Sequence, residues 1–146
     1  MVHMIELVID TSVIIKWYAV HQEPGFERAK TLLVEHATQH CRLHIPMLAL
    51  YEAGNALRYG TTLSEHEQVR SLADLFALGL SVYPLTLARA AAAHELSAVF
   101  GTSFYDACFV ALAQELDVTF VTADERLHRR IFSLPFAHTL ASYQLA

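Results

Sequence analysis

Two aspartates each follow a short apolar segment that is typical of a buried strand. Asp10 comes directly after residues 5–9, and Asp124 comes three residues after the segment 118–121. In parallel α/β folds, ligands bind outside the carboxyl ends of the strands, so both carboxylates are candidates for a site at that edge of the sheet. Either aspartate could instead cap the following helix, which stabilises a helix by about 1 kcal/mol.

Two further acidic residues lie in expected helices among mainly uncharged neighbours. Asp106 is in the first turn of a helix, expected over 103–116, that is apolar nearly all round, and burying an unpaired carboxylate is costly. The alternative is a capping box in which Asp106 reaches back to the backbone of Ser103. Glu52 shares its helical face with Leu48 and not with a stripe of charges, although a solvated glutamate is the commoner role at such a position.

If these four carboxylates converge, their repulsion requires either bound protons or a divalent cation. Two unit charges about 4 Å apart repel by about 4 kcal/mol at an effective dielectric constant of 20. Oxygen ligands without a dedicated set of His or Cys favour hard cations such as Mg²⁺ or Mn²⁺. A metal held at an open edge suits phosphodiester hydrolysis. The candidate catalytic residues and metal ligands are therefore Asp10, Glu52, Asp106 and Asp124.

The elements that must position these residues alternate between strands and helices. Strands are expected over 5–9, 43–45, 81–83 and 118–121, with a last one over 136–140. Helices are expected over 12–18, 25–39, 47–60, 65–78, 86–99, 103–116 and 125–131. This alternation predicts an α/β fold with a mainly parallel sheet that helices cover on both faces. With 146 residues and no linker or repeat, we expect a single domain over 1–146.

The composition excludes some classes of protein. Apolar residues make up 54% of the chain, but its longest segment without charge, 131–146, includes Pro135, His138 and Gln144, so no membrane span is expected. Glu6 interrupts the first apolar segment, so no secretory signal is expected either. The surplus of apolar residues indicates an exposed apolar face for an oligomer or a partner.

The two cysteines, Cys41 and Cys108, are expected to be small buried side chains in a reducing compartment, which predicts a cytoplasmic location. The net charge of −5 gives no overall sign of a nucleic-acid binder. Buried acids at one site would, however, hide a locally basic surface in that sum.

Other chemistries fit less well. His36, His40 and His44 recur at four-residue spacing and invite a zinc interpretation, but His44 is expected beyond the helix end. A phosphoacceptor receiver module also places aspartates at strand ends, yet it needs a lysine near a late strand, and the only lysines are Lys16 and Lys30. The five glycines form no nucleotide-binding pattern.

Four short motifs are spread along the chain in a defined order: Asp10-Thr11-Ser12, Glu52-x-x-Asn55, Tyr105-Asp106-Ala107 and Thr122-Ala123-Asp124. Together they resemble the motifs of the PIN domain family and, within it, of the VapC-type toxin ribonucleases, over essentially the whole chain. The resemblance implies a three-layer α/β/α sandwich and an endoribonuclease that depends on Mg²⁺ or Mn²⁺. It also implies a homodimer and a type II toxin–antitoxin pair, in which a small cognate antitoxin neutralises the toxin.

The resemblance implies roles for individual residues as well. Asp10 and Asp106 would be the principal metal ligands, Asp124 would complete the acidic pocket, and Glu52 would orient water or metal. The short polar side chains that would hold these carboxylates are Thr11, Ser12, Asn55 and Thr122. Asp117 stands where relatives often have glycine, and we interpret it as a turn residue.

The antitoxin would place a basic side chain in the acidic pocket and cover apolar surface near Trp17 and Tyr18. The alternatives are a PIN-fold nuclease that processes RNA without an antitoxin, a binding protein with an inactive site, and the receiver-like signalling module.

Several basic residues flank the expected site and are candidates for binding RNA phosphates without reading bases: Lys16, Arg58, Arg126, Arg129 and Arg130. Tyr105, next to Asp106, could stack on an unpaired base. Packing in the core is the more usual role for a tyrosine in such a helix.

Overall fold

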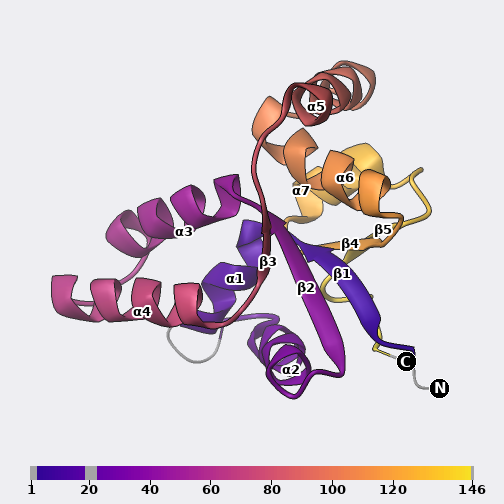
Figure 1. Ribbon diagram of the computed structural model, residues 1–146. Coiled ribbons are helices and arrows are strands. Elements are labelled where there is room, and N and C mark those ends of the chain that lie inside the picture. The colour runs from indigo at the N-terminus through magenta and orange to yellow at the C-terminus, as the bar shows by residue number, and fades with distance from the viewer. Residues whose placement is uncertain (1–2, 19–22, 146) are drawn as a thin grey trace.

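The computed structural model describes residues 3–18 and 23–145. In this part of the chain the strands are β1 (Ile5–Ile9), β2 (Cys41–Pro46), β3 (Ser81–Tyr83), β4 (Thr119–Thr122) and β5 (Ala137–Thr139). The helices are α1 (Thr11–Tyr18), α2 (Phe26–Ala37), α3 (Leu48–Tyr59), α4 (Glu65–Ala77), α5 (Leu87–Phe100), α6 (Phe104–Leu116) and α7 (Glu125–Ile131). The expected alternation of strands and helices is confirmed (Figure 1).

The five strands form one parallel sheet in the order β3-β2-β1-β4-β5. The chain builds outward from β1 through β2 to β3, and then returns to add β4 and β5 on the other side of β1. The connection that follows β1 therefore leads to one side of the sheet, and the connection that follows β4 leads to the other side. Such a switch point is where open parallel sheets place their ligands.

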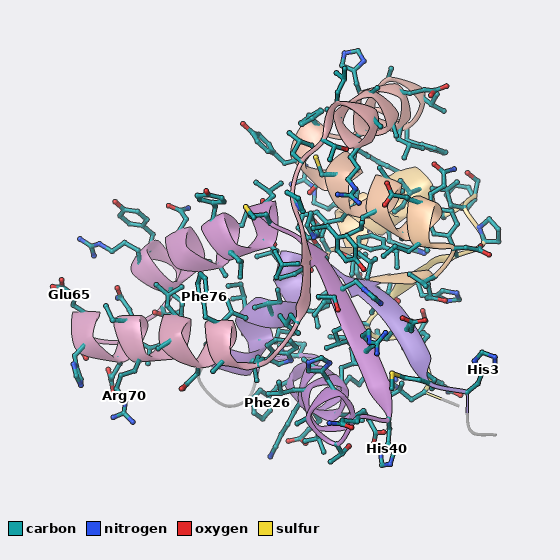
Figure 2. The ribbon with its side chains drawn as sticks, in the orientation of Figure 1. His3, Phe26, His40, Glu65, Arg70 and Phe76 are labelled. Carbon is teal, nitrogen blue, oxygen red and sulfur yellow. The ribbon has the colours of Figure 1, made fainter. Side chains whose placement is uncertain are left out.

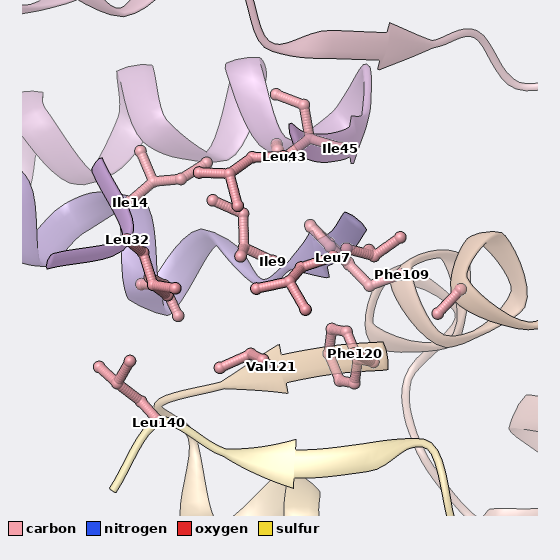
Figure 3. Packing of buried hydrophobic residues seen from close by; sticks show 14 of the residues in the cluster. Leu7, Ile9, Ile14, Leu32, Leu43, Ile45, Phe109, Phe120, Val121 and Leu140 are labelled. Atoms are coloured by element: carbon pink, nitrogen blue, oxygen red, sulfur yellow. The ribbon is translucent and has the colours of Figure 1, made fainter. Parts of the chain in front are cut away.

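Helices cover both faces of the sheet, as the sequence predicts: α1 and α2 lie on one side of it and α6 on the other (Figure 1). The central strands are apolar on both faces because both are buried, and Leu7, Ile9 and Phe120 are almost fully enclosed (Figure 3). The rings of Phe109 from α6 and Phe120 from β4 pack with their centroids 6.5 Å apart. This packing fixes α6 over the sheet.

The bounds differ from the prediction mainly at β2, which is longer than the expected 43–45. Its polar residue His44 is buried without penalty because its ring nitrogens contact the Tyr83 hydroxyl at 2.9 Å and Glu6 Oε1 at 3.0 Å. The prediction that Asp117 is a turn residue is confirmed: it ends α6 in the left-handed region with φ of 55°. Glycine is the commonest residue in this backbone conformation, and aspartate tolerates it, so Asp117 can replace glycine here.

No single helix in the described residues is long and apolar enough to cross a membrane. Helices α5 and α6 meet that requirement only when taken together, and they are bent by 113° at the break between them.

Candidate active site

Asp10 lies where β1 ends, and its side chain is only 6% exposed. Its Oδ2 atom accepts hydrogen bonds from the Ser12 hydroxyl at 2.7 Å and the Thr122 hydroxyl at 2.8 Å. The backbone amide of Asp10 donates to the carbonyl of Val121 at 3.0 Å. Strands β1 and β4 therefore hold this carboxylate jointly, at the switch point of the sheet.

The same two hydroxyls position Asp124. Thr122 Oγ1 accepts a hydrogen bond from the Asp124 amide, and Ser12 Oγ accepts one from the amide of Ala123, both at 3.0 Å. Asp124 Oδ1 in turn accepts from the amide of Leu127 at 3.1 Å and caps α7. The helix cap that the sequence allowed is thus present. Among the residues that the structure describes, Oδ2 of Asp124 accepts no hydrogen bond.

Glu52 and Asp106 reach the same edge from α3 and α6. The Thr11 hydroxyl at the start of α1 donates to Glu52 Oε1 at 2.8 Å, which joins α3 to the end of β1. Asp106 is half-buried in the first turn of α6, where its amide donates to Ser103 Oγ at 3.0 Å. The reciprocal hydrogen bond of a capping box, from the Ser103 amide to the carboxylate, is not formed within the described residues.

The pKa values show that these carboxylates act on one another. Burial is the main cause that raises the pKa of Asp10 from 3.8 to about 6, and the hydrogen bonds from Ser12 and Thr122 oppose it. The charges of Asp106 and Glu52 raise it further.

Burial also raises the pKa of Glu52 and of Asp106. The charge of Asp106 adds to the effect at Glu52, and the charge of Asp124 adds to the effect at Asp106. Asp106 is thus within electrostatic reach of each of the other three acidic side chains, at one edge of the sheet.

The chemistry of this edge fits a hard cation. Its donor atoms are carboxylate and hydroxyl oxygens, which Mg²⁺ and Mn²⁺ prefer. Among residues 3–18 and 23–145, no three His, Cys, Asp or Glu side chains are arranged to hold a metal ion by themselves. Mg²⁺ does not require such a group, because it usually keeps several waters and binds through one or two carboxylates together with substrate phosphates.

The three histidines considered for zinc do not form a group that could hold a metal ion in the described residues. The ring nitrogens of His36 are occupied by the carbonyl of Leu78 at 2.9 Å and the amide of Leu43 at 3.3 Å. His44 is enclosed in the sheet, as described above. His40 is exposed and pairs with Glu35 at 3.3 Å.

Two residues are placed differently from the expectation. Asn55 is exposed on α3 and, in the part of the chain that the structure describes, makes no hydrogen bond to a carboxylate. Tyr105 does not pack in the core: its side chain is 61% exposed. Tyr51 is 73% exposed beside Glu52, and the sequence reasoning missed it. The available signal was that a tyrosine directly precedes both Glu52 and Asp106.

The basic candidates either contact residues outside the acidic group or are exposed. Lys16 Nζ pairs with Glu23 at 3.3 Å, and the Arg58 guanidinium lies over the ring of Tyr59, 5.2 Å from its centroid. The three arginines of α7 are exposed: Arg126, Arg129 and Arg130.

The fold and the site together define a parallel α/β domain with an acidic centre at the switch point of its sheet. The chain belongs to the PIN domain family, because the model of that family matches residues 7–132. A comparison with curated proteins finds no match.

Solved structures agree with this assignment. PAE2754 from Pyrobaculum aerophilum is 21% identical, and the match covers 96% of this chain and 94% of that chain with a TM-score of 0.66. A toxin–antitoxin complex from Klebsiella pneumoniae matches at 18% identity, 95% and 99% coverage and a TM-score of 0.68. VapC20 from Mycobacterium tuberculosis, named as a sarcin–ricin loop cleaving toxin, matches at 16% identity, 84% and 93% coverage and a TM-score of 0.66. At these identities the likeness shows the fold.

Proposed function

We propose that the protein is an endoribonuclease that requires Mg²⁺ or Mn²⁺ and is the toxin of a type II toxin–antitoxin pair. The observation that carries the proposal is a group of four acidic side chains on a PIN fold, in which burial and the charges of neighbouring carboxylates raise the pKa of Asp10, Glu52 and Asp106. No contribution to folding explains such a group, because its members repel one another. The structural neighbours named as toxins support the choice of this biological role.

Asp10 and Asp106 would hold the cation, with Asp124 and Glu52 completing its surroundings. When bound, the cation would supply positive charge to the phosphate and lower the pKa of water. Ser12 and Thr122 keep Asp10 in its ionised form and in a fixed orientation, since both donate to it. Glu52 is half-buried with a raised pKa, so it is suited to accept a proton from the attacking water.

The basic residues around the site would bind RNA phosphates, as the sequence predicts, and those on α7 lie next to Asp124 in the chain. The antitoxin would neutralise the acidic centre with a basic side chain and cover apolar surface near Trp17 and Tyr18. Trp17 is half-buried, with Nε1 donating to the carbonyl of Ala29 at 2.8 Å. Exposed apolar residues on α5, Leu87 and Val99, support the homodimer that belongs to the proposal.

The test is cleavage of total RNA by the purified protein with Mg²⁺, with chelator, and with Asp106→Asn in place of the wild type. We expect Mg²⁺-dependent product bands that disappear with chelator and fall at least about 100-fold in Asp106→Asn, since a lost ligand costs several kcal/mol of transition-state stabilisation. Asp117→Asn is the matched control, because Asp117 is exposed and asparagine also tolerates its left-handed backbone. Equal cleavage by Asp106→Asn would contradict the proposal.

Thr122→Val tests the hydroxyl that connects Asp10 and Asp124. Thr122 is fully buried, so valine fills its space while removing the hydrogen bond to Asp10 and the acceptor for the Asp124 amide. We expect kcat/KM for RNA to fall about 10- to 100-fold, as for other groups that orient metal ligands. Thr62→Val, at an exposed loop position, should leave kcat/KM unchanged. A folded Thr122→Val protein with wild-type activity would show that the orientation of Asp10 and Asp124 by this hydroxyl does not contribute to activity.

A further inference from the structure

A cavity of about 250 Å³ lies beside the acidic group, between α3, the connection from β3 to α5, and α6. Its lining is mostly carbon and includes three tyrosine rings: Tyr51, Tyr83 and Tyr105. Tyr51 and Tyr105 are 73% and 61% exposed, so their rings lie at the surface of the protein. Rings at the surface of a cavity offer flat apolar faces to a ligand.

Two residues that line the cavity are neighbours in the chain of proposed catalytic residues, although none of the four carboxylates lines it. Tyr51 directly precedes Glu52 on α3, and Tyr105 directly precedes Asp106 on α6. A group bound in the cavity would therefore belong to the same substrate molecule as the group on which the four carboxylates act.

The only guanidinium of the lining is committed to other partners. Arg89 donates to both carboxylate oxygens of Glu115 at 3.1–3.3 Å and to the carbonyl of Pro84 at 2.9 Å, and it lies 5.3 Å from the ring centroid of Tyr83. These contacts fix the wall formed after β3. Because its charge is balanced by Glu115, Arg89 does not favour a phosphate, and the cavity favours an uncharged flat group.

The volume narrows the class of occupant further. Pockets for drug-sized ligands begin at about 300 Å³, so this cavity suits a single ring system and not a helix or a folded peptide. In single-stranded RNA the bases are free to leave the stack and pack on aromatic side chains, whereas in duplex RNA they are not.

We propose that this cavity binds an unpaired base next to the scissile phosphate, with the base packed against Tyr51 and Tyr105. The inference rests on the proposed ribonuclease function and extends it: the substrate is a single-stranded segment, and the cavity sets the preference for the base beside the cut. Phosphates on either side remain free to contact the basic residues around the site.

The test uses a single-stranded RNA library of random sequence, cleaved with Mg²⁺, with the product ends sequenced. Wild type is expected to prefer particular bases at one position beside the cut. Tyr51→Ala and Tyr105→Ala should flatten that preference and raise KM about tenfold, equivalent to about 1.4 kcal/mol, with a smaller change in kcat. Tyr51→Phe and Tyr105→Phe should keep the base preference, because they keep the aromatic ring. Phe76→Ala is the matched control, since Phe76 is an exposed ring on α4, which does not line the cavity (Figure 2).

A binding experiment separates the cavity from catalysis. Short RNAs that carry an abasic nucleotide at each position in turn are titrated into Asp106→Asn and into Asp106→Asn combined with Tyr105→Ala. One abasic position should weaken binding to the first protein about tenfold and leave binding to the second unchanged, because the two changes remove the same contact.

The outcomes distinguish the two proposals. Wild-type protein that fails to cleave any RNA overturns the ribonuclease function and this inference with it. Cleavage whose base preference and abasic penalty survive both alanine variants overturns the cavity inference alone. Sedimentation of the same variants gives a further check, because loss of self-association with unchanged base preference would mean that a second copy of the chain covers the cavity.

Discussion

Asp10→Asn is expected to make the metal-free protein more stable while abolishing its activity on RNA. The side chain is 6% exposed and its pKa is raised from 3.8 to about 6, mainly by burial. At neutral pH the folded protein therefore carries a buried charge that costs about 3 kcal/mol in free energy of unfolding. Asparagine has nearly the same shape and carries no charge. Its carbonyl oxygen can accept the same hydrogen bonds from Ser12 and Thr122.

The sign of the pH dependence follows from the direction of this pKa shift. Because the pKa in the folded state is above 3.8, the folded state holds the proton more tightly than the unfolded state does. The protonated Asp10 therefore contributes fully to the free energy of unfolding below pH 4, and this contribution is lost as the pH rises through about 6. We expect Asp10→Asn to exceed the wild type by up to about 3 kcal/mol at pH 7.5 in chelator, and to match it at pH 3.5.

Urea unfolding at the two pH values measures the difference in stability, and RNA cleavage with Mg²⁺ measures the activity. The activity should fall at least about 1000-fold, since the variant loses a proposed ligand of the cation. Asp117→Asn should change neither quantity. An Asp10→Asn protein that is less stable than the wild type at pH 7.5 would show that the buried charge of Asp10 does not destabilise the folded protein.

The location of the acidic group was predictable because it depends on strand ends, which are visible in the sequence. Residues 7–9 form an uninterrupted apolar run because β1 is the central strand and is covered on both faces. The chain must then leave the sheet at Asp10. The same reasoning places Asp124 after β4, and parallel pairing of β1 with β4 puts both at one edge.

The direction of side chains on helices was not predictable in the same way. Tyr105 and Asp106 are consecutive in α6, an almost wholly apolar helix, yet the first turn of α6 extends beyond the core and leaves the tyrosine exposed. Asn55 follows Glu52 by less than one turn of α3, but only Glu52 reaches the end of β1, through Thr11. Exposure at these positions depends on where neighbouring elements pack. The helical period shows which residues share a face of a helix, but not which part of that face a neighbour covers. The cavity beside the site was therefore also invisible.

Mg²⁺ is expected to stabilise the wild-type protein strongly, because a bound cation balances the buried negative charge that Asp10 carries at neutral pH. At a free Mg²⁺ concentration of 100 times Kd the gain in free energy of unfolding is about 2.7 kcal/mol. The apparent affinity should fall as the pH falls through about 6, where Asp10 takes up its proton and competes with the cation. Thermal unfolding with and without Mg²⁺, at constant ionic strength and at pH 5 and 7.5, measures both effects.

Asp10→Asn, which lacks the buried charge, is the comparison that tests where Mg²⁺ binds. Asp10→Asn has lost both the repulsion and a ligand, so its Tm should hardly respond to Mg²⁺, while Asp117→Asn should respond as the wild type does. The amide and the cation are each expected to remove the cost of a buried charge at Asp10. Under the proposed function, only the cation leaves a centre that acts on a phosphodiester. Equal Tm increases for the wild type and Asp10→Asn would mean that Mg²⁺ binds elsewhere on the protein.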